Sequence, residues 1–164
     1  MTQVSKTAKT IMAAILARLQ ESGGNSIRID VNGKDSGIMP LSVELVQTNV
    51  KSGYGIGNLY SFAHYYEQNG DLMRDPEIVY LVIDHRGGDA GDMDRLVIFP
   101  QMWQQDGIIG GYRELITIDS ENRVGMYRPI PQRDAAQFTT LWMKNIKWQQ
   151  NIKPIAAKAK FVPY

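Results

Sequence analysis

The first hydrophobic pattern along the chain has the period of an α-helix. Apolar residues recur every three or four positions between residues 4 and 19, so they share one face of a helix. Ser5 or Thr2 can supply the N-cap hydroxyl, and Gly23-Gly24 follows the pattern with residues suited to a left-handed cap. The segment therefore predicts an amphipathic helix that ends at these glycines.

From residue 41 onward, the period changes from that of a helix to that of a strand. Apolar and β-branched residues form short runs, and glycine- and asparagine-rich turns separate these runs. A weaker alternation at 26–30, before Asn32-Gly33, is typical of a short strand or hairpin. The stronger runs lie at residues 43–46, 59–66, 78–83, 96–99, 111–118 and 123–127. They predict an antiparallel meander.

A second helical pattern follows Pro129 and Pro131, with Asp134 as the expected cap. Its aromatic positions form one stripe that runs toward Trp148, and Pro154 is expected to end or bend the helix. Residues 153–164 then form a basic tail. The predicted fold is one α+β domain over residues 1–164, in which an antiparallel sheet of five to six strands carries both helices on one face.

Composition narrows the classes of function. The 164 residues are 43% hydrophobic and 21% charged, which is typical of a globular domain. Cysteine is absent, so disulfides, thiol nucleophiles and cysteine-ligated metals are excluded. The apolar run at residues 11–19 is too short to span a membrane, and we expect a cytoplasmic protein without a membrane partner. A net charge of +1 means that nucleic-acid binding would require a local patch.

The densest group of polar residues lies between His64 and Glu77. On a regular strand, His64 and Tyr66 share one face and Glu67 lies on the other, so His64 and Glu67 converge only if a bulge intervenes. We favour a rigid connection, in which Asn69-Gly70 forms the turn and Pro76 sets the entry into the next strand. The candidate binding residues of this group are His64, Tyr66, Glu67, Asn69, Asp71, Arg74, Asp75 and Glu77.

Two loops contain residues that could bind a metal ion or a phosphate, but the spacing of these residues does not favour either function. Residues 84–94 combine His85 with several aspartates but lack the glutamate that a calcium loop needs, which favours a solvated hairpin loop or a contact with a basic partner. The glycine-rich residues 53–57 precede a strand and not a helix, so they do not form a phosphate-binding loop. No nucleophile elbow or catalytic triad can be placed with His64 and His85.

The second helix also presents a basic run with an interleaved aromatic residue. Lys144, Lys147 and Trp148 are candidate binding residues, and Lys153, Lys158 and Lys160 extend the run. Such a patch can bind nucleic-acid phosphates. The favoured interpretation is that Trp142 packs in the core and the lysines form a solvated face.

Two segments resemble an uncharacterised family of small domains encoded on phages, plasmids and integrative elements. They are AHYYEQNGDLMRDPEI at residues 63–78 and FTTLWMKNIKWQQNI at residues 138–152. The family pattern is His-Tyr-Tyr-x-x-Asn-Gly-Asp with a following Asp-Pro-Glu and a closing helix with Phe and Trp. This resemblance implies a mobile-element context, in which small domains often inhibit host defence, for example as anti-CRISPR proteins.

The preferred functional expectation is a non-enzymatic binding protein that needs no cofactor and occludes a host or viral macromolecule, either a protein or a nucleoprotein. A first alternative is a metal-dependent hydrolase or nuclease that uses Asp71, Asp75, Glu77 and His64. A second alternative is an accessory protein that binds nucleic acid directly through Lys144, Lys147 and Lys153.

Overall fold

The computed structural model describes residues 1–156. The chain begins with helix α1 (Lys6–Ser22), as the apolar pattern predicts. The Ser5 hydroxyl caps the helix by accepting the Ala8 N–H at 3.2 Å, and Gly23 ends it in the left-handed conformation, with φ of 74°. Both predicted helix ends are therefore confirmed.

The central element is an antiparallel sheet in which each strand pairs with the next one along the chain. Its strands are β1 (Ser26–Ile29), β2 (Leu41–Ser52), β3 (Gly55–Gln68), β4 (Asp71–Asp84), β5 (Leu96–Gln104) and β6 (Tyr112–Glu114). Two short 3-10 helices, η1 (Lys34–Ser36) and η2 (Met93–Arg95), lie in the connections before β2 and β5. The predicted meander is confirmed, and the long strands β3 and β4 form its centre.

The single strand expected over residues 111–118 is wrong. The chain changes sheets at Leu115, where β6 ends and a two-stranded sheet of β7 (Ile116–Ile118) and β8 (Val124–Tyr127) begins. Leu115 and Ile116 are both fully buried, but Ile116 joins a second core on the opposite side of the main sheet. Adjacent residues of a strand point to opposite faces, so Leu115 and Ile116 can both be buried because each face is covered at this position. The single strand fails because residues 116–118 pair with β8 and not with β5.

The second helix, α2 (Pro129–Gln149), begins earlier than the predicted cap at Asp134. Pro129 occupies the first turn, where the missing N–H costs no helical hydrogen bond. The buried Gln132 side chain exchanges two hydrogen bonds of 2.7 Å with the Thr2 backbone. The helix ends before Pro154, as expected. Ile155, which lies within the expected tail, packs against the core and its N–H bonds the Thr10 carbonyl. Residues 157–164 of that tail lie outside the described part.

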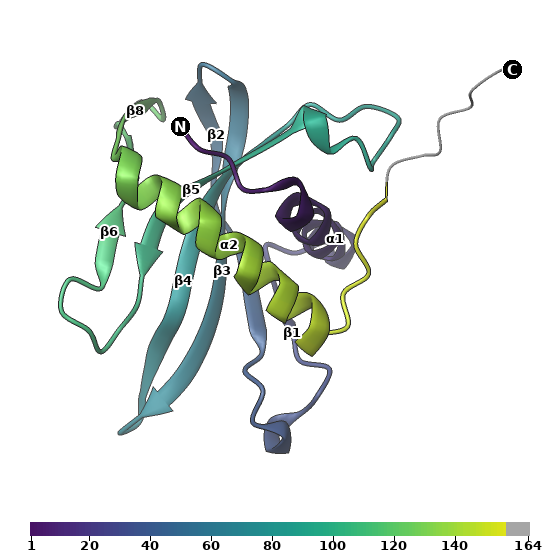
Figure 1. Ribbon diagram of the computed structural model, residues 1–164, viewed down its shortest axis with the longest axis vertical. Helices are drawn as coiled ribbons and strands as arrows, with labels where there is room; N and C mark the ends of the chain where they lie inside the picture. The colour runs from purple at the N-terminus through teal and green to yellow at the C-terminus, as the bar shows by residue number, and fades with distance from the viewer. Residues whose placement is uncertain (157–164) are drawn as a thin grey trace, which may run out of the picture.

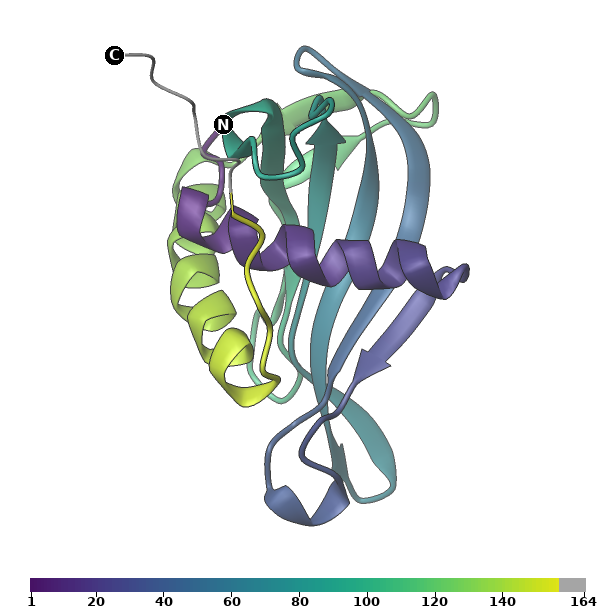
Figure 2. The same cartoon turned by 90° about the vertical axis from the view of Figure 1, so that its right-hand side faces the viewer.

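Both helices cover the same face of the sheet (Figures 1 and 2). Their apolar faces meet alternating sheet residues in one large core, in which Phe62 packs edge-on against Tyr80 at 5.4 Å. The Tyr80 hydroxyl and the Thr139 hydroxyl are hydrogen-bonded at 2.8 Å, and burial raises the pKa of Tyr80. The predicted α+β architecture with both helices on one face is confirmed.

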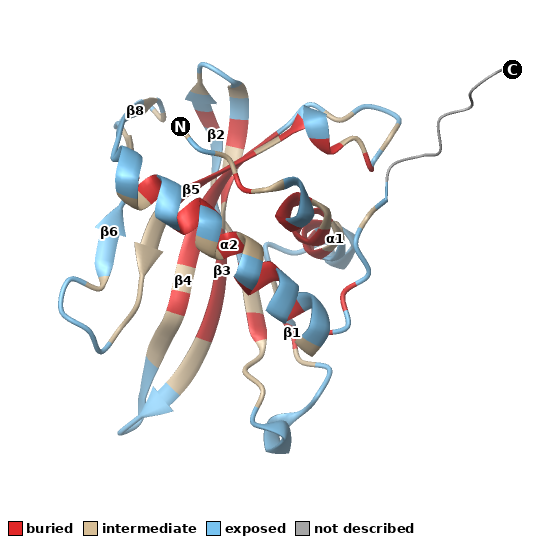
Figure 3. Cartoon of the chain, viewed as in Figure 1, coloured by how far each residue is buried: buried red, intermediate tan, exposed pale blue. Residues whose placement is uncertain are grey.

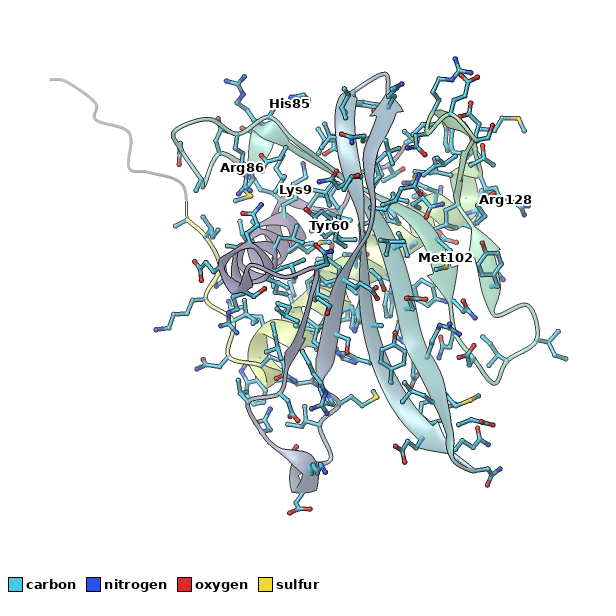
Figure 4. The ribbon with its side chains drawn as sticks, turned by 180° about the vertical axis from the view of Figure 1, so that it is seen from behind. Lys9, Tyr60, His85, Arg86, Met102 and Arg128 are labelled. Atoms are coloured by element: carbon cyan, nitrogen blue, oxygen red, sulfur yellow. The ribbon has the colours of Figure 1, made fainter. Side chains whose placement is uncertain are left out.

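The opposite face of the sheet is covered only at one end. There the β7–β8 sheet packs on a smaller apolar cluster that includes Leu81, Phe99 and Ile116. Figure 4 shows the sheet from this side, with Met102 on it and His85 and Arg86 in the loop after β4. The far ends of β3 and β4 extend beyond both covering layers, and burial decreases along them (Figure 3).

Candidate functional site

The β3–β4 hairpin carries all eight candidate residues between positions 64 and 77. The predicted turn at Asn69-Gly70 is confirmed, because both residues have positive φ, 53° and 83°. The connection expected over residues 71–77 is wrong: it is part of β4 and pairs with β3. This end of the hairpin leaves the covered region, so its strands have no apolar alternation from which the sequence could have revealed them.

A β-bulge in β4, opposite His64, determines which candidates lie together. Ala63 pairs with Glu77 and Tyr65 pairs with Arg74, so the register shifts between these two pairs. His64 points toward the helices because it alternates with Phe62 along β3, and its ring packs edge-on against Trp142 at 5.5 Å. Glu77 lies on the opposite face, because it bonds Ser61, which alternates with the core residue Phe62. Ordinary strand alternation therefore separates His64 from Glu77, and the extra residue of the bulge in β4 places Arg74 on the same face as Glu77.

His64 is a buried neutral imidazole. The residue is 5% exposed, and its Nε2 has no hydrogen-bond partner among residues 1–156. Burial lowers its pKa from the ordinary value, and the nearby Asp75 carboxylate opposes this shift more weakly. The surroundings suit a packed core histidine, as the more common role of a histidine on a half-buried strand suggested.

We expect the free energy of unfolding to decrease as the pH falls below about 6.5, the ordinary pKa of histidine. The unfolded chain gains a proton there that the native His64 ring excludes, so protonation favours unfolding until the native ring is protonated too. Urea titrations at pH 7.5 and 5.5 measure the effect. His64→Phe should remove most of the decrease in the free energy of unfolding between these two pH values. His85→Asn, a substitution at an exposed position, should leave the decrease in place. An equal decrease in His64→Phe would contradict this assignment.

A polar network occupies the uncovered face of the sheet. Glu77 Oε2 accepts the Ser61 hydroxyl at 2.6 Å, and Glu77 Oε1 lies 3.2 Å from Arg74 Nε. The Arg74 backbone N–H donates to Asp106 at 2.8 Å, which is the main cause of the lowered pKa of Asp106. Gln104 donates to the other oxygen of Asp106 at 3.2 Å. These bonds join β3, β4 and the segment after β5, so Arg74 and Glu77 act first as structural links.

The remaining candidates of the hairpin follow two patterns. Asp75 accepts a 2.9 Å hydrogen bond from the Gln105 side chain, which helps to hold the β5–β6 loop against the hairpin. Glu67, Asn69 and Asp71 are exposed at the hairpin tip, and Tyr66 is half-buried beside them. These side chains are free to contact a partner but do not surround a cavity.

The carboxylates proposed as metal ligands are not brought to one point. Asp71 and Glu77 are six residues apart on one extended strand, a separation of about 20 Å. Within residues 1–156, no group of three or more His, Asp or Glu side chains is placed to hold a metal ion. The described geometry therefore offers no support for the metal-dependent alternative.

The basic candidates form a separate surface between the two helices. Lys144, Lys147 and Trp148 line a groove with Lys6, which comes from the first turn of α1. Trp148 is 89% exposed, whereas Trp142, two turns earlier on α2, is buried in the core as predicted. Lys158 and Lys160 lie outside the described residues. The lysines form a solvated face, and nucleic-acid binding at it stays a prediction.

The sequence reading missed a groove between α2 and the β5–β6 loop. Its volume is about 350 Å³, and its floor is formed by Trp103 and Phe138, whose rings pack at 4.7 Å. Ile108 and Ile109 form the loop side, with Arg113 of β6 beside them. Two adjacent isoleucines within the glycine-rich residues 107–111 were the available signal, because a loop of this kind cannot bury both in a core.

The comparisons with known proteins identify the family of the chain. Among the described residues, neither helix is long and apolar enough to cross a membrane. A search of curated proteins and a search of solved structures each returned no match. A family model described as a domain of unknown function (DUF6908) matches residues 7–152. Because this match spans most of the sequence and both helices, the chain belongs to the DUF6908 family.

Proposed function

We propose that the protein is a non-enzymatic binding protein that occludes a protein partner through the groove beside α2. We call this surface the β6 groove and define it by Trp103, Ile108, Ile109, Arg113 and Phe138. The observation that carries the proposal is the exposure of its two isoleucines, 59% for Ile108 and 106% for Ile109. Adjacent aliphatic side chains that project into water beside an aromatic floor are typical of a contact surface.

The chemistry of the groove favours a protein partner over a small polar ligand. Trp103 and Phe138 provide a rigid aromatic floor of the kind that anchors protein interfaces. Arg113 makes no ion pair with any residue of the described chain, so its guanidinium is free to meet a carboxylate. The partner we propose presents an apolar side chain to the floor and an acidic side chain to Arg113.

The biological setting is part of the same proposal. The resemblance of residues 63–78 and 138–152 to domains of mobile elements supports a phage or plasmid origin. Small proteins of that origin often act in the host cytoplasm as inhibitors of defence systems, including CRISPR nucleases. A surface that can cover a partner, without a described set of convergent catalytic residues, suits inhibition by occlusion.

Ile109→Asp is expected to abolish stoichiometric complex formation, because it places a charge where the partner's apolar side chain is desolvated. Tagged wild type and variant are purified from host cells after nuclease treatment, and complex mass is measured by light scattering. The matched control is the double variant Lys144→Glu, Lys147→Glu, which should keep the complex. On a host with an active CRISPR system, wild type and this control should restore plaques of a targeted phage, and Ile109→Asp should not.

Three results would contradict the proposal. Wild type without a stoichiometric partner would remove the binding function itself. A complex that survives Ile109→Asp but is lost with the lysine variant or with nuclease would favour the nucleic-acid alternative at the helix surface. A wild-type complex without any effect on plaque formation would remove the role in that defence system.

A further inference from the structure

The β6 groove lies next to an open edge of the main sheet. β6 is the last strand of the six-stranded order, and within the described chain no strand pairs with its outer side. The Leu115 N–H bonds the Gln101 carbonyl at 2.8 Å and the Gly111 carbonyl accepts the Gln105 N–H at 2.7 Å. Since main-chain groups alternate in direction along a strand, those of Tyr112 and Glu114 point outward from the sheet.

We propose that an extended segment of the partner protein adds to β6 as a seventh strand and places one side chain in the β6 groove. This inference rests on the proposed function and specifies its partner. The outward N–H and C=O groups of Tyr112 and Glu114 provide up to four main-chain hydrogen bonds for such a segment. Unpaired edge groups and an apolar groove beside them are the two features that strand addition requires.

The register of β6 defines which side of the added strand enters the groove. Arg113 pairs with Trp103, so both side chains lie on the same face of the sheet. Trp103 packs against Phe138 of α2, which places this face on the helix side. A residue of the added strand opposite Arg113 therefore points toward the groove. Its neighbours point away, beside the side chains of Tyr112 and Glu114.

Charge argues against a second copy of this chain as the occupant. The three residues of β6 allow one full antiparallel pairing with themselves, which is centred on Arg113. That pairing sets two guanidinium groups directly opposite each other, and like charges in this position destabilise a strand pair. An acidic or apolar residue of a different protein fits opposite Arg113 without this penalty.

Glu114→Pro is expected to weaken binding of an extended peptide at least about tenfold, because it removes an outward N–H and places a ring in the path of the added strand. The probe is a library of random 12-residue peptides displayed on yeast and selected against the wild-type protein. Glu114→Ala, which keeps the N–H, should bind the selected peptides within about twofold of wild type. Proline is tolerated on edge strands, and a thermal melt checks that the variant folds.

Hydrogen exchange gives a test that does not depend on a folded proline variant. On binding of a selected peptide to the wild type, the amides of Tyr112 and Glu114 should exchange more slowly. Unchanged exchange of these amides would overturn strand addition, and so would an unchanged affinity of the folded Glu114→Pro variant for the peptide. If Ile109→Asp still loses binding in that case, the proposed function remains supported. Selection of no peptide, or a wild-type dimer that Glu114→Pro dissociates, would also overturn strand addition. Selected peptides whose affinity is changed by neither Glu114→Pro nor Ile109→Asp would contradict the β6 groove as the binding site.

Discussion

Replacing Trp142 by alanine is expected to lower the free energy of unfolding by about 3–5 kcal/mol. The side chain is 5% exposed and lies where α2 meets the sheet. Its ring contacts Phe138 of the same helix, at 5.9 Å, and His64 of β3. Truncation would leave a cavity between these rings that the helix and the paired strands cannot close.

Trp148→Ala is the matched control, since it deletes the same side chain from the same helix at a position that is 89% exposed. Urea unfolding followed by circular dichroism should show a change within about 0.5 kcal/mol for this variant. Equal losses for the two tryptophans would mean that Trp142 is not the packing anchor of α2. The two tryptophan variants also separate an effect on folding stability from an effect on nucleic-acid binding at the lysine surface, because only Trp148 lies on that surface.

Replacing Gly57 by alanine is expected to cost about 3 kcal/mol through overpacking between the central strands. A Cβ at this position would lie 2.4 Å from the Val82 carbonyl oxygen and 2.7 Å from Ile83 Cγ1. The carbonyl belongs to the backbone of β4, so it cannot move aside as the end of a flexible side chain can. The whole β3–β4 pair would have to separate locally.

Gly53→Ala provides the comparison for this second substitution. Gly53 lies in the turn between β2 and β3, and an added Cβ there meets no atom within 4 Å. Differential scanning calorimetry should show a much lower melting temperature for Gly57→Ala than for the wild type. The melting temperature of Gly53→Ala should stay close to that of the wild type. A melting temperature of Gly57→Ala close to that of the wild type would show that the strands can accommodate the methyl group, which would contradict overpacking against the Val82 carbonyl.

Local features of the candidate residues were predictable from the sequence, but their arrangement was not. The turn at Asn69-Gly70 follows from two residues that tolerate positive φ, and the burial of Trp142 follows from helical spacing. The bulge in β4 opposite His64 depends on how β3 and β4 align over their length, and no local pattern records that alignment. Because of this bulge Arg74 and Glu77, three residues apart on β4, lie on the same face of the sheet and form an ion pair.

The elements of this protein with local causes could be derived from the order of residues alone. Helix α1, its caps, the hairpin turns and the approximate positions of the strands depend on contacts between residues near in sequence. The change of sheet at Leu115, the early start of α2 and the β6 groove depend on contacts between distant segments. Trp103 of β5 and Phe138 of α2 form a groove floor only because α2 packs over the face of the sheet that carries Trp103, and a one-dimensional pattern contains no information on that contact.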